Sequence, residues 1–194
     1  MKTNLYDFDK TIYNGDSTLD FYFFCLRRKV VIIKYLPIFF IYFILFKLNK
    51  KTKEDMKEKF YLFLTCFDNI NVLVEDFWKY NERKIKEFYR VKSNKNDIVI
   101  SASPEFLLRP ICNKLSINNL IASKVDSKTG RYIGKNCAGE EKVNRLKKEF
   151  NNIVIEEVYS DSYDDTPILK LGKKSYLVKK NKLVLLKEKE FDNI

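Results

Sequence analysis

Asp7-Phe8-Asp9-Lys10-Thr11 is the stretch that decides the fold, and it closes a short strand predicted over residues 3–7. Side chains alternate along an extended chain, so Asp7 and Asp9 point one way and Phe8 the other. Ligands of an open parallel sheet bind at the carboxyl ends of its strands. Two carboxylates held there repel each other unless a cation lies between them, and a hard divalent cation such as Mg²⁺ prefers oxygen ligands.

A second acidic stretch, Asp161-Ser162-Tyr163-Asp164-Asp165, follows another strand predicted over residues 153–160. Parallel strands bring their carboxyl ends to one edge of the sheet, so the two acidic stretches are expected to meet. Solvation alone is a poor explanation for two acidic clusters that both follow strands. The pattern therefore predicts one acidic site.

Ser101 and Lys142 are candidates for holding an anion beside these carboxylates. Ser101 ends an apolar run at residues 97–101 that is typical of a buried parallel strand. Ser103 and Pro104 are predicted to begin a helix that runs to about residue 115, whose N-terminus favours anions. Lys142 lies in the first turn of a helix predicted over residues 139–150, where the dipole disfavours a cation, and pairing with phosphate accounts for its position.

Strands and helices alternate over residues 1–14 and 96–194, with further strands at 119–123, 175–178 and 183–186, a hairpin over 124–134 and a short helix over 164–171. This alternation predicts an α/β fold in which helices flank a parallel sheet. Between these parts, the sequence shows only patterns typical of helices. We therefore divide it into a catalytic core, residues 1–14 and 96–194, and an inserted all-helical cap, residues 15–95.

The amino-acid composition limits the partners and the catalytic mechanisms that this protein can have. Lys and Arg number 37 against 26 Asp and Glu, and the net charge of +11 favours anionic partners. The chain has no histidine, which excludes Ser-His-Asp and Cys-His catalysis and HExxH zinc sites. The four cysteines form no CxxC pair and are expected to be reduced thiols of a cytoplasmic protein. No apolar region typical of a signal peptide precedes Asp7.

Residues 30–48 are nearly all apolar and lie within a basic segment, residues 27–53. Three interpretations are open. The stretch is a helix pair buried in the cap, or it contacts an anionic membrane surface, or it spans the bilayer. A span needs about 20 apolar residues, and Lys34 and Pro37 interrupt this one.

Taken in order, these residues resemble the four motifs of the haloacid dehalogenase (HAD) superfamily: residues 7–11 the first, Ser101 the second, Lys142 the third, and Asp161 with Asp165 the fourth. The resemblance covers nearly the whole chain. The chain is similar to the phosphoserine-phosphatase-like members, whose helical cap is inserted between the first two motifs. This resemblance implies a Rossmann-like HAD core with an inserted helical cap.

The resemblance also implies roles for the residues. Asp7 would be the nucleophile that becomes an aspartyl-phosphate, and Asp9 the general acid and base. Mg²⁺ would be held by the Asp7 carboxylate, the Asp9 main-chain carbonyl and Asp161, with Asp165 in support. The phosphoryl oxygens would be held by Ser101, Lys142 and main-chain N–H groups near Phe8, Asp9 and Ala102.

The sequence departs from phosphoserine phosphatases in ways that bear on the substrate. Lys10 stands where many members have Gly, and Ser101-Ala102-Ser103 replaces Ser-Gly-Gly. Phosphoserine phosphatases carry a Glu that recognises the substrate soon after the first motif. In this chain the nearest acid to that place is Asp16, which is therefore a candidate substrate contact. The apolar stretch and residues 119–123 also resemble bacterial HAD-type phosphatidylglycerophosphate phosphatases.

The leading interpretation is a Mg²⁺-dependent phosphatase that works through an aspartyl-phosphate on a small phosphorylated metabolite. The alternatives are a lipid-phosphate phosphatase at a membrane surface, a phosphotransferase, and a non-catalytic anion-binding module, against which the full set of motif residues argues. We expect a phosphorylated small molecule or lipid phosphate as partner, and no nucleic acid. A cytoplasmic location is expected, with contact to an anionic membrane through residues 27–53 left open, as is the oligomeric state.

Overall fold

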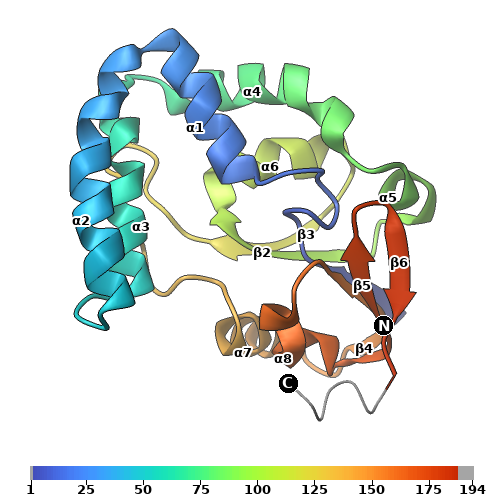
Figure 1. Ribbon diagram of the computed structural model, residues 1–194. Coiled ribbons are helices and arrows are strands. Elements are labelled where there is room, and N and C mark those ends of the chain that lie inside the picture. The colour runs from blue at the N-terminus through green and yellow to red at the C-terminus, as the bar shows by residue number, and fades with distance from the viewer. Residues whose placement is uncertain (1, 188–194) are drawn as a thin grey trace.

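The computed structural model describes residues 2–187 and has a six-stranded sheet at its centre (Figure 1). The strands are β1 (Lys2–Tyr6), β2 (Ile98–Pro104), β3 (Asn119–Ser123), β4 (Val154–Ser160), β5 (Gly172–Lys179) and β6 (Lys182–Leu185). Their order in the sheet is β3-β2-β1-β4-β5-β6. All neighbours pair in parallel except β6, which is antiparallel to β5. The predicted α/β class with a mainly parallel sheet is confirmed.

Helices cover both faces of the sheet, and β1 shows why. Leu5 belongs to one buried cluster and Tyr6 to the other, because successive side chains of a strand point to opposite faces. On the Leu5 face lie α7 (Glu140–Glu149) and α8 (Thr166–Leu169), and on the Tyr6 face lie α4 (Ile70–Asn81) and α6 (Glu105–Lys114) (Figure 1). The central strands are therefore buried on both sides.

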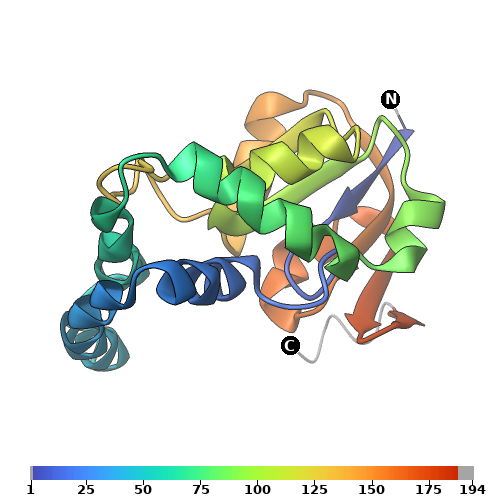
Figure 2. The ribbon, with the colours of Figure 1, turned by 90° about the horizontal axis from the view of Figure 1, so that it is seen from above.

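All elements between β1 and β2 are helical. Besides α4 they are α1 (Ser17–Arg28), η1 (Val30–Tyr35), α2 (Leu36–Lys47), α3 (Lys53–Tyr61), η2 (Leu62–Cys66), η3 (Glu82–Lys84) and α5 (Glu87–Lys92). In Figure 2, α1 leads away from the sheet, α2 and α3 stand clear of it, and α4 returns toward the core. The expected helical content is confirmed, and the division into domains at residues 15 and 95 stays a prediction.

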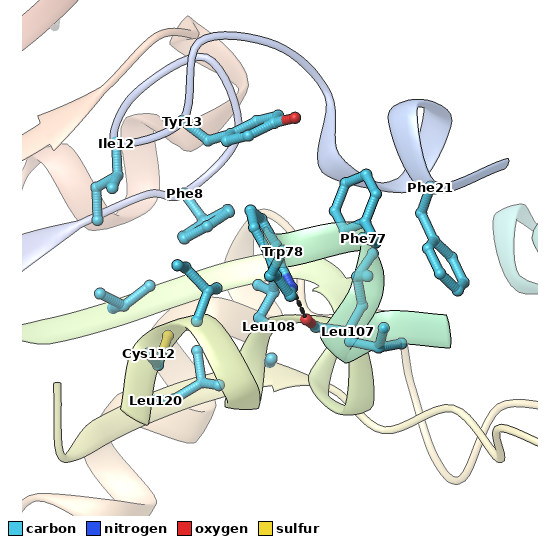
Figure 3. Close-up of a cluster of buried hydrophobic side chains, with 14 of the residues drawn as sticks. Phe8, Ile12, Tyr13, Phe21, Phe77, Trp78, Leu107, Leu108, Cys112 and Leu120 are labelled. Carbon is cyan, nitrogen blue, oxygen red and sulfur yellow. Dashed lines mark hydrogen bonds between the residues drawn. The ribbon is translucent and has the colours of Figure 1, made fainter. Parts of the chain in front are cut away.

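An aromatic cluster joins the inserted helices to the core (Figure 3). Trp78 of α4 packs edge-on against Phe8 and Tyr13, with ring centroids 6.0 and 5.5 Å away. Its indole N–H donates a hydrogen bond of 2.6 Å to the carbonyl of Leu107 on α6. Phe8 is fully buried. Its side chain therefore anchors the loop that carries the two aspartates of the first motif.

The predicted helix start at Ser103 and Pro104 is wrong. Strand β2 runs through Pro104, whose backbone is extended (φ −62°, ψ 135°), and α6 begins at Glu105. The Ser103 hydroxyl donates to Asp9 instead of capping the helix. A local capping pattern cannot anticipate this contact, because Asp9 comes from a distant part of the chain.

The hairpin predicted over residues 124–134 is reduced to one antiparallel bridge between Val125 and Tyr132. The segment packs against α3 instead, where the Tyr132 N–H donates to Glu58 (2.8 Å). A Cβ on Gly130, which has a φ of 73°, would lie 2.7 Å from the carbonyl oxygen of Tyr61. Glycine therefore permits this close approach between the core loop and the inserted helices.

The long apolar stretch forms η1 and α2, and most of its residues are exposed, while the others except Ile32 are only partly buried. Over Val30–Lys47 the mean hydropathy is 2.1, yet only 6% of the segment is buried. Within residues 2–187 it is the one helical segment long and apolar enough to cross a membrane. Burial in the cap, the first of the three interpretations, is therefore wrong for most of this stretch. Residues of α2 pack on α3 without any of them becoming buried.

Candidate active site

A cavity of about 460 Å³ lies at the carboxyl ends of β1, β2 and β4. Core residues at or just after the ends of these strands, or in and beside α7, line one part of it: Asp7, Asp9, Lys10, Ser101, Ala102, Ser103, Ala138, Gly139, Lys142, Asp161, Ser162, Asp164 and Asp165. The inserted helices and their N-cap supply the rest: Asp16, Thr18, Leu19, Phe39, Lys53, Met56, Lys57, Phe60 and Tyr61. Every candidate site residue from the sequence lines this cavity except Phe8, whose side chain lies in the aromatic cluster.

Lys142 joins two aspartates from different strand ends. Its ammonium donates to Asp7 Oδ1 and to Asp165 Oδ2, both at 2.7 Å, and all three residues are buried. Burial raises the pKa of Asp7 against the opposing effect of Lys142. Burial would lower the pKa of Lys142, but the two carboxylates outweigh it and raise that pKa. The pairing explains a cation in the first turn of α7, where the helix dipole disfavours one.

Lys142→Met is expected to lower the free energy of unfolding by about 3–5 kcal/mol, because it leaves two buried carboxylates without their partner. Urea unfolding in the presence of EDTA measures this change. The matched control is Lys148→Met on the exposed side of the same helix, which should change stability by less than about 0.5 kcal/mol. Equal losses in the two variants would contradict the pairing role of Lys142.

Asp9 is held by hydrogen bonds to both carboxyl oxygens. The main-chain N–H of Ser17 donates to Oδ1 at 2.6 Å, and the hydroxyl of Ser103 donates to Oδ2 at 2.5 Å. Burial, and after it the nearby Asp16, raises the pKa of Asp9 to about 6. A carboxyl group with such a pKa can both give and accept a proton near neutral pH.

Ser103 and Lys57 belong to the cavity although the sequence analysis did not place them there. Ser103 lies two residues after Ser101 in β2 and so points the same way, but the sequence pattern predicted a helix start there and did not indicate the extended backbone. Lys57 of α3 donates to the Ala102 carbonyl (3.2 Å) and to Asn136 Oδ1 (3.0 Å), and burial lowers its pKa to about 8. No local pattern marks Lys57, because only the packing of α3 against the core brings it to the site.

Lys10 adopts a left-handed backbone conformation, with a φ of 57°. Glycine adopts this conformation at lower cost, which is a physical reason for glycine to be common there in the family that the motifs resemble. A hydrogen bond of 2.8 Å from the Lys10 N–H to the Gly15 carbonyl holds the loop in shape. The departure at this position therefore leaves the loop geometry intact.

The oxygen atoms around the cavity fit a hard cation. Among residues 2–187, no three His, Cys, Asp or Glu side chains form a group that could hold a metal ion. Mg²⁺ does not need such a group, since it is usually bound by one or two carboxylates together with water and substrate phosphate. Asp7 and Asp161 both line the cavity, and burial raises the pKa of each. A bound cation would stabilise their charged forms.

The protein thus has an α/β fold in which aspartates at the strand ends surround a buried lysine. Residues 5–170 match the family model for haloacid dehalogenase-like hydrolases, so the chain belongs to this family. The resemblance drawn from the four motifs is thereby confirmed, and the chain is a hydrolase.

The proteins to which this chain is similar include a curated relative and two solved structures. A histidinol-phosphatase of Neisseria meningitidis serogroup C (strain 8013) is 31% identical over 86 residues, which are 38% of this chain and 39% of that protein. The match therefore spans well under half of this relative.

A crystal structure of a protein of unknown function from Bordetella pertussis Tohama I is 18% identical, with a TM-score of 0.67 and coverage of 91% of this chain and 89% of the other. A phosphoserine phosphohydrolase-like protein from Francisella tularensis subsp. tularensis SCHU S4 is 16% identical, with a TM-score of 0.56 and coverage of 91% and 87%. Both structures share the fold.

Proposed function

We propose that this hydrolase is a Mg²⁺-dependent phosphomonoesterase that forms an aspartyl-phosphate on Asp7. The observation that carries the proposal is the buried Asp7–Lys142–Asp165 network beside Asp9 in one cavity. The partial match to a histidinol-phosphatase supports a phosphate monoester as the substrate class.

Asp7 would act as the nucleophile. A carboxylate oxygen of Asp7 attacks phosphorus while the bond from phosphorus to the ester oxygen breaks. The ammonium of Lys142 and the Ser101 hydroxyl, both at the cavity, would hold the phosphoryl oxygens. Mg²⁺, bound by Asp7, the Asp9 carbonyl and Asp161, would neutralise the charge that develops on those oxygens.

Asp9 would move the proton in both halves of the reaction. Protonated Asp9 gives its proton to the departing ester oxygen, and its carboxylate then accepts a proton from the water that attacks the aspartyl-phosphate. Attack by water frees Asp7 and inorganic phosphate. Ser17 and Ser103 hold the Asp9 carboxyl in place for both transfers.

We also propose that residues 15–95 act as a cap that selects the substrate over a core of residues 1–14 and 96–194. The inserted helices place Lys57 and Phe60 at the cavity, and Asp16 stands at the start of α1, where it accepts a hydrogen bond from the Leu19 N–H (2.9 Å). A cytoplasmic location is part of the proposal, supported by four free cysteines.

A lipid phosphate is a second candidate substrate. Phe39 of α2 and Phe60 of α3 have ring centroids 5.4 Å apart, and both line the cavity. The remainder of α2 is the exposed apolar segment. An acyl chain attached to a phosphate in the cavity would therefore find an apolar path toward that segment.

A panel of phosphate esters tests both candidates. The purified chain is assayed with Mg²⁺ on para-nitrophenyl phosphate, phosphoserine, histidinol phosphate and, in detergent micelles, phosphatidylglycerophosphate. We expect phosphate release that EDTA abolishes. Release confined to the lipid would favour the second candidate, and release from none of the esters would contradict the phosphatase. With glycerol added, less phosphate than nitrophenol would indicate transfer to an alcohol.

A further inference from the structure

The exposed surface of α2 has no role in the proposed chemistry. No charged residue occurs between Leu36 and Phe46, and no residue of α2 is buried. Five of its apolar side chains are 36–57% exposed: Ile38, Phe40, Ile41, Phe43 and Ile44. Single exposed apolar residues are ordinary, but a contiguous surface of them marks a binding site.

Positive charge predominates at this surface, and the acids nearest to it along the chain are Asp20 and Glu54. Residues 21–53 contain eight Lys and Arg and no Asp or Glu. The Lys47 ammonium lies 5.7 Å from the centroid of the Phe43 ring, and the Lys51 ammonium lies 5.7 Å from that of Tyr42. These lysines thus run along the apolar side chains and end at their border. Apolar side chains bordered by cations suit the boundary between acyl chains and anionic headgroups.

We propose that the surface formed by residues 30–53, here called the α2 surface, docks onto an anionic lipid membrane with α2 lying along the headgroup region. Length alone does not exclude a bilayer span, because η1 and α2 together comprise 18 residues, so it is the packing of α2 that argues against a span. Phe39 packs on Phe60 in the wall of the catalytic cavity. If α2 crossed the bilayer, this wall would be lost.

A second copy of the chain is the competing occupant of an apolar surface. In a two-fold dimer the same surface meets itself. The five lysines within residues 30–53 of one copy would then face those of the other, and this range contains no Asp or Glu to pair with them. Anionic headgroups can pair with each of these cations. The charge pattern therefore favours lipid over self-association.

Flotation with lipid vesicles tests the proposal. The full chain is mixed with vesicles of phosphatidylglycerol and phosphatidylcholine in equal parts, or of phosphatidylcholine alone. We expect binding to the anionic vesicles that weakens as salt is added. The double variant Phe40→Glu/Ile44→Glu should reduce the partition coefficient by about tenfold or more. Lys50→Gln/Lys51→Gln should reduce it by about ten- to thirtyfold.

Matched variants carry the same changes elsewhere on the surface. Val91→Glu/Ile133→Glu alters two side chains that are 76% and 61% exposed outside the α2 surface. Lys147→Gln/Lys148→Gln removes two exposed charges from α7. Both should bind as the unaltered chain does, and urea unfolding verifies that each variant is folded. Asp7→Asn should also bind normally, so failure of docking is distinguishable from failure of the proposed chemistry.

Three results would overturn the proposal. The first is flotation of Phe40→Glu/Ile44→Glu equal to that of the unaltered chain. The second is a dimer, seen by analytical ultracentrifugation, that this variant dissociates while no vesicle binding occurs, which would assign the surface to a second copy. The third is vesicle-bound chain that resists both high salt and alkaline carbonate, which would indicate a bilayer span.

Discussion

Asp7→Asn is expected to abolish Mg²⁺-dependent release of phosphate from para-nitrophenyl phosphate, with turnover falling by more than about 10⁴-fold, or about 5.5 kcal/mol of barrier. The amide of Asn has no anionic oxygen to attack phosphorus, and it cannot form the acyl phosphate that water then hydrolyses. Lys142 keeps its partner Asp165 in this variant, so the core of the ion-pair network is retained. The loss should therefore be one of chemistry and not of folding.

The measurement is nitrophenol release under saturating substrate, with urea unfolding to verify the fold. Asp97→Asn is the matched control, since Asp97 is also a buried aspartate with a pKa raised by burial. It precedes β2, at the opposite end of the sheet from the cavity, and accepts a hydrogen bond from the Asn94 N–H (2.7 Å). Retained turnover in Asp7→Asn, or an equal loss in Asp97→Asn, would remove Asp7 from the nucleophile role.

Asp9→Asn is expected to cut turnover by about 10²–10⁴-fold, the usual contribution of a general acid and base. The substitution preserves size and leaves the main-chain carbonyl of Asp9 available to a metal. The Ser17 and Ser103 hydrogen bonds show that this side chain is already positioned in the cavity. Removing the proton donor should therefore slow the reaction while fold and Mg²⁺ binding remain.

Comparing substrates with different leaving groups distinguishes proton donation by Asp9 from a merely structural role of this residue. Nitrophenol departs readily without a proton, whereas the alcohol of phosphoserine needs one, so Asp9→Asn should slow alkyl esters more than para-nitrophenyl phosphate. Asp164→Asn is the control, since Asp164 lines the same cavity and has no role in the proposed chemistry. It should leave the ratio of the two rates unchanged. A ratio unchanged in Asp9→Asn as well would contradict proton donation by Asp9.

Local patterns were enough to predict much of this protein. An aspartate that directly follows a short apolar strand lies at a sheet edge because chain geometry puts it there, and Asp7 and Asp161 are such cases. The alternation of strands and helices was enough to predict a parallel sheet, since parallel neighbours need crossover connections. Lys142 was detectable because a cation in the first turn of a helix conflicts with the dipole unless a partner lies nearby.

The sequence did not predict the features that depend on contacts between segments far apart in the chain. Ser103 fits a helix cap locally, but Asp9 takes its hydroxyl, and no pattern near residue 103 contains that information. Lys57 reaches the cavity only because α3 packs beside the core. The apolar composition of α2 is the same whether the helix is buried or exposed, so the sequence does not predict what covers it.

By itself the sequence determined the sheet and the acidic edge, through periodicities that a short segment carries. Tertiary structure alone decided which side chains meet there and which apolar surface remains open, because both depend on packing between remote parts of the chain.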